Sequence, residues 1–235
     1  MDNFERASIL TEALPYIRAY TGKTIVVKYD AMQSADLQKA VISDIILLSL
    51  IGVRVILVHG AEKPETGMDI VGMITDEGGK AFSFTGLDAS LFTLKDNVLQ
   101  INSELVNLAL DNGFIPVISS IARGPGNKPS KDIDAVTAAM ELAVSLGAQK
   151  LILLTGSSGV QNKDGTLISE LPISKVRLFI KEGIISSDMV HPVNSCVLAV
   201  RKGVPRAHIL DDRVPHSILV EMLTDSGIGT MILED

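Results

Sequence analysis

Lys28 is the side chain that most directly suggests chemistry on an anion. It lies near the end of the aliphatic run KTIVVKY, residues 23–29, which predicts a buried strand. Ligands of open α/β sheets bind at the carboxyl ends of strands, and a lysine buried there costs desolvation unless it meets an anion. A phosphate-binding turn usually needs glycine, so that backbone N–H groups can approach the ligand. Here the turn is Tyr29-Asp30-Ala31-Met32. The stretch is therefore a phosphate site, a relic of one, or simply a loop.

Asp132 and Asp134 are a second candidate for chemistry, because they are two positions apart. In an extended segment both carboxylates face the same way and could hold Mg²⁺ through their oxygens. The alternative is that Asp134 is the N-cap of the helix predicted over 134–146, with Asp132 solvated. The preceding loop GPGNKPS, residues 124–130, lacks the second glycine of a Walker loop and is interpreted as an ordinary loop.

The histidines at 59 and 191 and the single cysteine are expected to be structural. His59 and His191 each end a predicted element, and neither has a serine, cysteine or aspartate at a recognisable catalytic spacing. Cys196 lies in an apolar helical stripe with Val193 and Val197, which predicts a small buried side chain.

Short apolar runs alternate with helical patterns along most of the chain, which is typical of βαβ units around a mostly parallel sheet. Strands are predicted at 23–29, 53–59, 80–86, 114–121, 150–155, 206–210 and 229–234, and helices at 34–51, 103–112, 134–146, 174–182, 192–201 and 217–223, with a further short helix that ends at Gly78-Gly79. The turn Asp164-Gly165 predicts a hairpin over 159–169. No linker interrupts this pattern, so residues 23–235 are expected to form one domain.

The composition excludes several classes of protein. The chain has 235 residues, 46% of them hydrophobic but only 4% aromatic, so the core is expected to be aliphatic. A net charge of −7 without a basic run argues against nucleic-acid binding. One cysteine excludes an internal disulfide, and we see no signal peptide or membrane span, so a cytoplasmic location is expected. Residues 1–22 predict an added helix that Pro15 kinks, docked outside the sheet or against another subunit.

Several phrases together resemble the acetylglutamate kinases of the amino-acid kinase family. They are TEALPYIRAYTGKTIVVKY, LVHG, GFIPVI, DAVTAAMELAVSLGAQKLILLTGSSGV and AHILDDRVPHSILVEMLTDSGIGTMI. The resemblance covers nearly the whole chain except a stretch after His59. It implies an αβα sandwich with an N-lobe at about 23–122 and a nucleotide lobe at about 123–235. It also implies transfer of the γ-phosphoryl group of Mg-ATP to the side-chain carboxylate of N-acetylglutamate, in arginine biosynthesis.

The resemblance implies that some phosphate-handling residues remain. Lys28 matches the first phosphate-binding lysine of the family. Nucleotide contacts are expected at Gly60, Thr155, Gly159 and Met189.

Other family positions are altered in this sequence. The two glycines and asparagine expected after Tyr29 are replaced by Asp30, and the expected HGGGP reads HGAEKP. The N-lobe is shortened, and an arginine that grips the substrate is missing with the lost segment. Val136 stands in place of the aspartate that orients the catalytic lysines, and Asp132 in place of a substrate-binding asparagine. Gly156 replaces another aspartate, and Pro192 replaces the second lysine.

The ends of the chain resemble the arginine-binding region of arginine-inhibited members. Tyr16, Gly227 and Gly229 match that region, whereas Ser226 replaces an expected acidic residue. The added N-terminal helix interlocks subunits in such members, so a homo-oligomer through this helix is expected, unless the helix simply covers a sheet edge.

Two functions remain open from the sequence. The first is a catalytically weak or inactive relative with a residual ligand-binding or assembly role. The second is an active acetylglutamate kinase whose site is rebuilt, with Asp132 and Asp134 on Mg²⁺ and Lys63 or Lys128 in place of the lost lysine.

Overall fold

A computed structural model describes residues 2–29, 34–60, 66–96, 98–124 and 130–235. Asp30, Lys63 and Lys128 lie outside the described residues, so the hypotheses that concern them stay hypotheses.

The centre of the fold is one eight-stranded sheet in the order β10-β12-β11-β9-β1-β2-β6-β3. Its strands are β1 (Thr24–Lys28), β2 (Arg54–His59), β3 (Ala81–Thr85), β6 (Ile115–Ser119), β9 (Lys150–Thr155), β10 (Glu170–Pro172), β11 (Arg206–Asp211) and β12 (Thr230–Leu233). Every neighbouring pair is parallel except β11 and β12. The mostly parallel sheet that the sequence predicts is confirmed.

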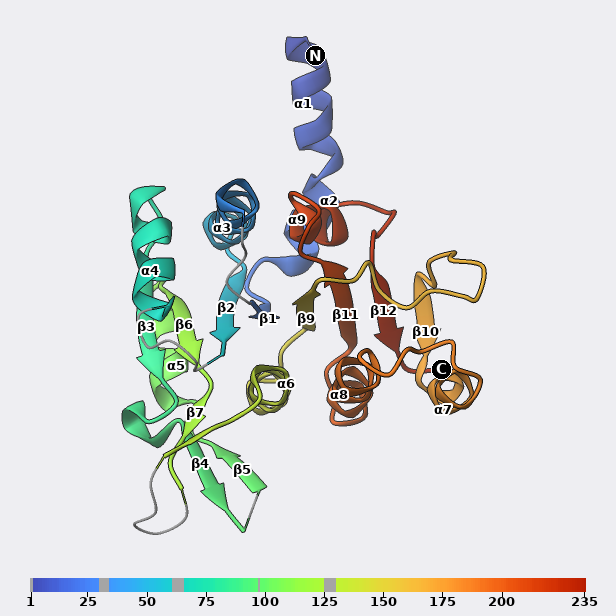
Figure 1. Cartoon of the computed structure of the whole chain (residues 1–235). Helices are drawn as coiled ribbons and strands as arrows, with labels where there is room; N and C mark the ends of the chain where they lie inside the picture. Colours follow the sequence, from blue (N-terminus) through green and yellow to red (C-terminus); the bar gives the residue numbers. More distant parts are fainter. Residues whose placement is uncertain (1, 30–33, 61–65, 97, 125–129) are drawn as a thin grey trace.

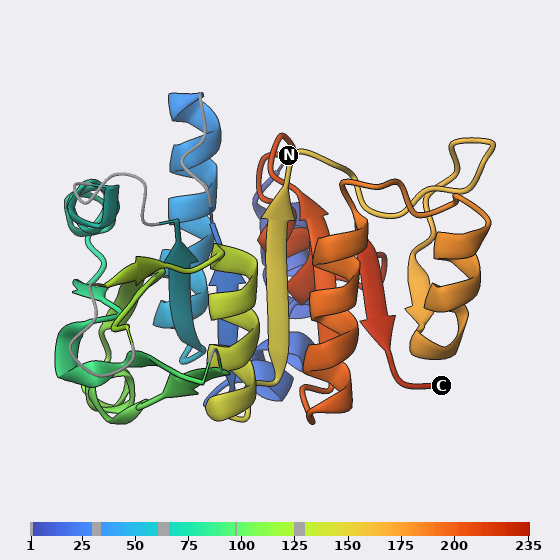
Figure 2. The same ribbon diagram turned by 60° about the horizontal axis from the view of Figure 1, so that its bottom comes forward.

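Helices cover both faces of this sheet (Figures 1 and 2). One face carries α3 (Ala35–Leu50), α4 (Thr66–Asp76) and α9 (Ser217–Leu223), and the other carries α5 (Glu104–Asp111), α6 (Ala135–Ser145), α7 (Ile173–Lys181) and α8 (Val190–Arg201). Two aliphatic cores result, one on each side of the sheet. The central strands are buried on both faces, which explains their unbroken runs of valine, isoleucine and leucine.

Local signals set the ends of the helices that lead away from the strands. Ser34 caps α3, where its hydroxyl accepts a hydrogen bond from the Leu37 N–H at 3.5 Å. Gly52 then closes the helix with a φ of 87°, a conformation that favours glycine. Asp134 caps α6 in the same way as Ser34 caps α3, as the second interpretation of that residue predicts.

The N-terminal extension is two helices rather than one kinked helix. α1 (Asn3–Glu12) and α2 (Leu14–Tyr20) meet at Ala13, and Pro15 falls in the first turn of α2, where its missing N–H costs nothing. α2 packs beside α9, whereas α1 extends away from the rest of the molecule (Figure 1). Phe4 on α1 is 87% exposed.

Smaller elements were not predicted from the sequence. They are the hairpin of β4 (Phe92–Lys95) and β5 (Val98–Ile101), the short pair of β7 (Ile121–Ala122) and β8 (Lys131–Asp132), the short turn η1 (Asp88–Ser90) and the edge strand β10. The β4–β5 hairpin packs against the β7–β8 pair at Gly86. A Cβ at this position would lie 2.0 Å from the Ile121 carbonyl oxygen, so the contact needs glycine. The hairpin expected over 159–169 forms as a short one. It has an antiparallel bridge between Gln161 and Leu167, and the Asn162 N–H donates to the Thr166 carbonyl and the Ile168 N–H to the Val160 carbonyl, both at 2.8 Å.

No helix in the described part of the chain is both long and apolar enough to cross a bilayer.

Candidate functional site

Lys28 is the last residue of β1, and its neighbours in the sheet are β9 and β2. The side chain is buried at the carboxyl edge of the sheet, as the sequence predicts. His59 ends the adjacent strand β2, where its Nδ1 lies 2.7 Å from the carbonyl oxygen of Gly60. The parallel pairing of β1 with β2 therefore brings Lys28 and Gly60 to one edge of the sheet.

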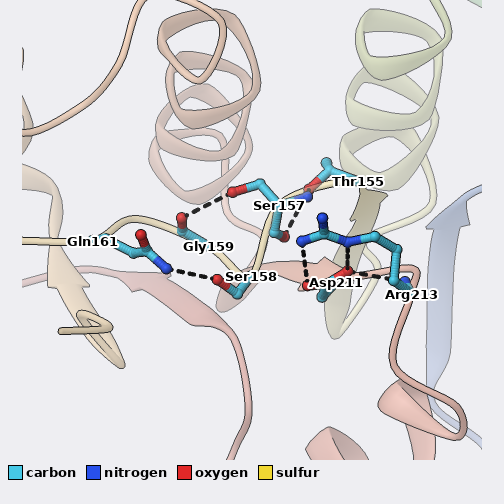
Figure 3. Close-up of polar contacts among 7 residues, drawn as sticks. All are labelled: Thr155, Ser157, Ser158, Gly159, Gln161, Asp211 and Arg213. Atoms are coloured by element: carbon cyan, nitrogen blue, oxygen red, sulfur yellow. Dashed lines mark hydrogen bonds and ion pairs between the residues drawn. The ribbon is translucent and has the colours of Figure 1, made fainter. Parts of the chain in front are cut away.

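The loop after β9 is built from hydroxyls and glycine. The Thr155 Oγ1 accepts a hydrogen bond from the Ser157 N–H at 3.3 Å, and the Ser157 Oγ donates to the Gly159 carbonyl at 3.2 Å (Figure 3). Gly159 has a φ of 115°, and a Cβ there would lie 2.5 Å from Thr230 Oγ1. The loop lies so close to β12 that only glycine fits this position.

A cavity of about 240 Å³ opens between this loop and the start of α8. It is lined by Ser157, Gly159, Val160, Gln161, Asn162, Ile184, Ile185, Ser186 and Met189. The structure thus brings together Gly159 and Met189, two of the predicted nucleotide contacts, while Thr155 forms the base of the same loop. Gly60 lies on a different strand and does not line this cavity. None of the described residues that line it is charged.

An arginine that the sequence reasoning missed lies beside this loop. Arg213 follows β11, and its Nε and Nη2 donate to Asp211 at 2.9 and 2.8 Å, a bidentate pair (Figure 3). Hydrogen bonds from Arg213 outweigh the effect of burial and hold the pKa of Asp211 below its usual value. The signal in the sequence is the acidic pair that ends a strand, Asp211-Asp212, followed at once by Arg213.

Asp134 and His191 meet at the starts of α6 and α8. The His191 Nε2 lies 2.8 Å from the Asp134 Oδ2, which also accepts from the Thr137 N–H at 2.7 Å. Burial alone would raise the pKa of Asp134, but the hydrogen bonds from His191 and Thr137 outweigh it, and the net pKa is lowered. The two residues are 57 positions apart, so no local pattern in the sequence indicates this pairing.

Asp132 has different surroundings from Asp134. It is exposed on β8, whereas Asp134 is occupied by the α6 N-terminus and His191. Within the described ranges, no three acidic, histidine or cysteine side chains gather closely enough to hold a metal ion. The carboxylate-pair hypothesis thus has no third ligand among the described residues.

A second and larger cavity, of about 470 Å³, lies beneath α9, and we refer to it as the α9 pocket. It is lined by Tyr16, Tyr20, Lys150, Ser169, Glu170, Arg206, His208, Glu221, Met222, Thr224, Asp225, Ser226, Gly227, Gly229 and Met231. All three predicted effector residues, Tyr16, Gly227 and Gly229, are among them. The Tyr16 hydroxyl donates a short hydrogen bond to Asp225, which joins α2 to the segment after α9.

His208 and Glu221 form the buried base of the α9 pocket. The His208 Nδ1 lies 2.8 Å from the Glu221 Oε1, and burial lowers the pKa of His208. Lys150, also buried, lies with its Nζ 5.0 Å from the centre of the Tyr20 ring. The pocket therefore presents both charge signs and a buried imidazole. A histidine within the apolar strand Arg206–Asp211 was the available sequence signal.

These features define the class of the protein. A sequence profile of the amino acid kinase family matches residues 64–211, and the chain belongs to this family. Within the family the chain is similar to acetylglutamate kinases. It is 37% identical to that of Clostridium kluyveri over 283 aligned positions, which cover 99% of this chain and 100% of the relative. It is 38% identical to that of Clostridium beijerinckii, with 99% of each chain covered. Because this chain has only 235 residues, the relative has several tens of positions without a counterpart here.

Solved structures show the same fold. N-acetylglutamate synthase from Neisseria gonorrhoeae, complexed with coenzyme A and N-acetyl-glutamate, has a TM-score of 0.83 at 25% identity, covering 100% of this chain and 64% of that chain. Carbamate kinase from Giardia lamblia bound to AMP-PNP has a TM-score of 0.63 at 17% identity, covering 91% of this chain and 99% of that chain.

Proposed function

We propose that this member of the amino acid kinase family is a weak or inactive acetylglutamate kinase that keeps ligand binding. The observation that carries the proposal is the lack of charge at Val136 and Pro192, two positions where the resemblance places an aspartate and a lysine. Phosphoryl transfer depends on positive charge and N–H donors around the transferred group. Lys28 is one such charge at the carboxyl edge of the sheet.

Both residues lie in the first turn of a helix. Val136 of α6 is buried in the hydrophobic core on this side of the sheet. The position that the resemblance assigns to the orienting aspartate therefore carries no charge. Pro192 lies in the first turn of α8, where the resemblance places a phosphate-binding lysine. Losing one such group lowers the rate of catalysis by about 10²–10³-fold. Several losses together leave little phosphoryl transfer.

The test is a hydroxamate trap for the acyl phosphate, run with Mg-ATP and N-acetylglutamate. We expect no turnover above background. Turnover that disappears in Lys28→Ala would show instead that the chain is an active acetylglutamate kinase with a rebuilt site. Thermal unfolding with ATP, with and without Mg²⁺, measures residual binding separately, because a ligand of the folded state raises the midpoint.

A second candidate function is arginine binding in the α9 pocket. It is favoured by the convergence of Tyr16, Gly227 and Gly229 on one cavity, with Glu221 and Asp225 as carboxylate partners for a guanidinium group. Asp225 offers the acidic group that Ser226 does not. The solved N-acetylglutamate synthase from Neisseria gonorrhoeae has also been crystallised with L-arginine.

Calorimetric titration with arginine tests this candidate. Heat is expected with the wild-type protein and its loss with Glu221→Gln, while Glu182→Gln, an exposed glutamate away from the pocket, should bind as wild type does. Sedimentation in the same buffer tests assembly through α1, which exposes the apolar side chains of Phe4 and Ile9. A monomeric mass would rule out that assembly.

A further inference from the structure

The wall of the α9 pocket is a short helix without a cap of its own. α9 spans only Ser217–Leu223, and its N-cap residue His216 makes no capping hydrogen bond with its side chain. His216 also has a φ of 58°, a left-handed conformation that costs energy in a residue other than glycine. The first N–H groups of a helix need partners from elsewhere when the N-cap supplies none.

Asp44 supplies that partner from the neighbouring helix α3. Its side chain is fully buried on a face that otherwise packs isoleucine and leucine. One carboxylate oxygen lies 2.6 Å from the His216 Nδ1, and the other accepts from the Leu219 N–H at 3.4 Å. A buried carboxylate is costly without such partners, and negative charge is favourable at a helix N-terminus. Asp44 is thus bound on one side by His216 and on the other by the first turn of α9.

The orientation of α9 decides the shape of the α9 pocket. Glu221 and Met222 project from this helix into the cavity, and the segment 224–229 follows directly from its end. Glu221 also accepts from the Ile228 N–H at 3.2 Å, so the helix and the segment move together. A rotation of α9 would separate Glu221 from His208 as well.

We propose that Asp44 is the positioning residue of the α9 pocket, because it caps α9 from α3 and so holds Glu221 where it lines the cavity. The proposal deepens the second candidate function and rests on it for the identity of the ligand. The position of α9, however, is testable without any ligand.

Native-state amide exchange tests the capping role. In Asp44→Leu the amides of Leu219 and Val220 are expected to exchange about tenfold faster relative to Ile152 of β9, since losing an N-cap shifts local opening by about that factor. Asp44→Asn keeps one acceptor oxygen and is expected to fall between wild type and Asp44→Leu. If Asp44→Leu does not fold, Asp44→Asn and His216→Asn give the same comparison.

Asp111→Asn is the matched control, because it removes a carboxylate from an ion pair with Arg54 that is remote from α9. Its α9 amides should exchange as in wild type. Equal acceleration of α9 and β9 in the Asp44 variants, or no acceleration in α9, would overturn the capping role.

Arginine affinity tests the consequence for the pocket. Calorimetry with wild type, Asp44→Asn and Asp111→Asn should show weaker binding, by several-fold, in Asp44→Asn alone. Faster α9 exchange with unchanged arginine affinity would overturn the positioning role. If wild type gives no heat with arginine, the arginine hypothesis fails, and the exchange comparison alone decides whether Asp44 holds α9.

Discussion

Replacement of Gly159 by alanine should destabilise the protein through two separate costs. With a φ of 115°, the backbone at this position is strained for any residue with a Cβ, at about 1–3 kcal/mol. The added methyl group would also lie 2.5 Å from Thr230 Oγ1. That hydroxyl accepts from the Val160 N–H and donates to the Ile168 carbonyl, both at 2.8 Å, in a fully buried position.

The magnitude follows from what the methyl group displaces. Each of the two Thr230 hydrogen bonds is worth about 1 kcal/mol, so a shift of the hydroxyl adds about 2 kcal/mol to the backbone strain. A total of about 3–5 kcal/mol lowers the unfolding midpoint of a chain of this size by roughly 6–20 °C. Calorimetric or denaturant unfolding of the variant measures this loss directly.

Two comparisons separate the costs. Gly165 has a φ of 83° with open space around it, so Gly165→Ala carries the strain alone and should be about 2 kcal/mol less damaging. Thr230→Ala removes the hydroxyl that the new methyl group would strike, so its effect and that of Gly159→Ala should not add. If Gly159→Ala is no worse than Gly165→Ala, or if the effects of the Gly159 and Thr230 replacements add, the close packing of the loop on β12 is refuted.

Other predictions concern titration and reactivity. The pKa of Asp134 is lowered in the folded state, so its contribution to stability is present above its unfolded pKa and is lost as pH falls through the folded value. The difference in unfolding free energy between wild type and Asp134→Asn should therefore shrink below about pH 4, whereas a constant difference would contradict the contact with His191. Cys196 is fully buried, and burial raises the pKa of its thiol. It should react with a disulfide reagent only in denaturant, and rapid labelling of native protein would exclude this packing. Arg213→Lys should raise the pKa of Asp211 toward its usual value, because lysine cannot replace the bidentate pair. Carboxyl chemical shifts followed by NMR through a pH titration measure this change, and an unmoved pKa would assign it to another cause.

Much of the scaffold was predictable because its signals are local. The unbroken aliphatic runs around Val26 and Leu153 identify buried parallel strands, and Ser34 and Asp134 begin helices by accepting hydrogen bonds within the next turn. The short hairpin of β4 and β5 and the edge strand β10 were missed, because their residues form no long apolar run and pairing decides their structure.

The sequence by itself determined the layered α/β scaffold, the membership of the family and the placement of Lys28 at a strand tip, because periodicity, caps and motifs are properties of neighbouring residues. Only the tertiary structure decided which distant side chains meet. Asp44 reaches His216 across 172 residues, His208 meets Glu221 between a strand and a helix, and Asp134 contacts His191 at the starts of two helices. Such contacts depend on the order of the strands and the packing of helices across the sheet, which no local pattern encodes.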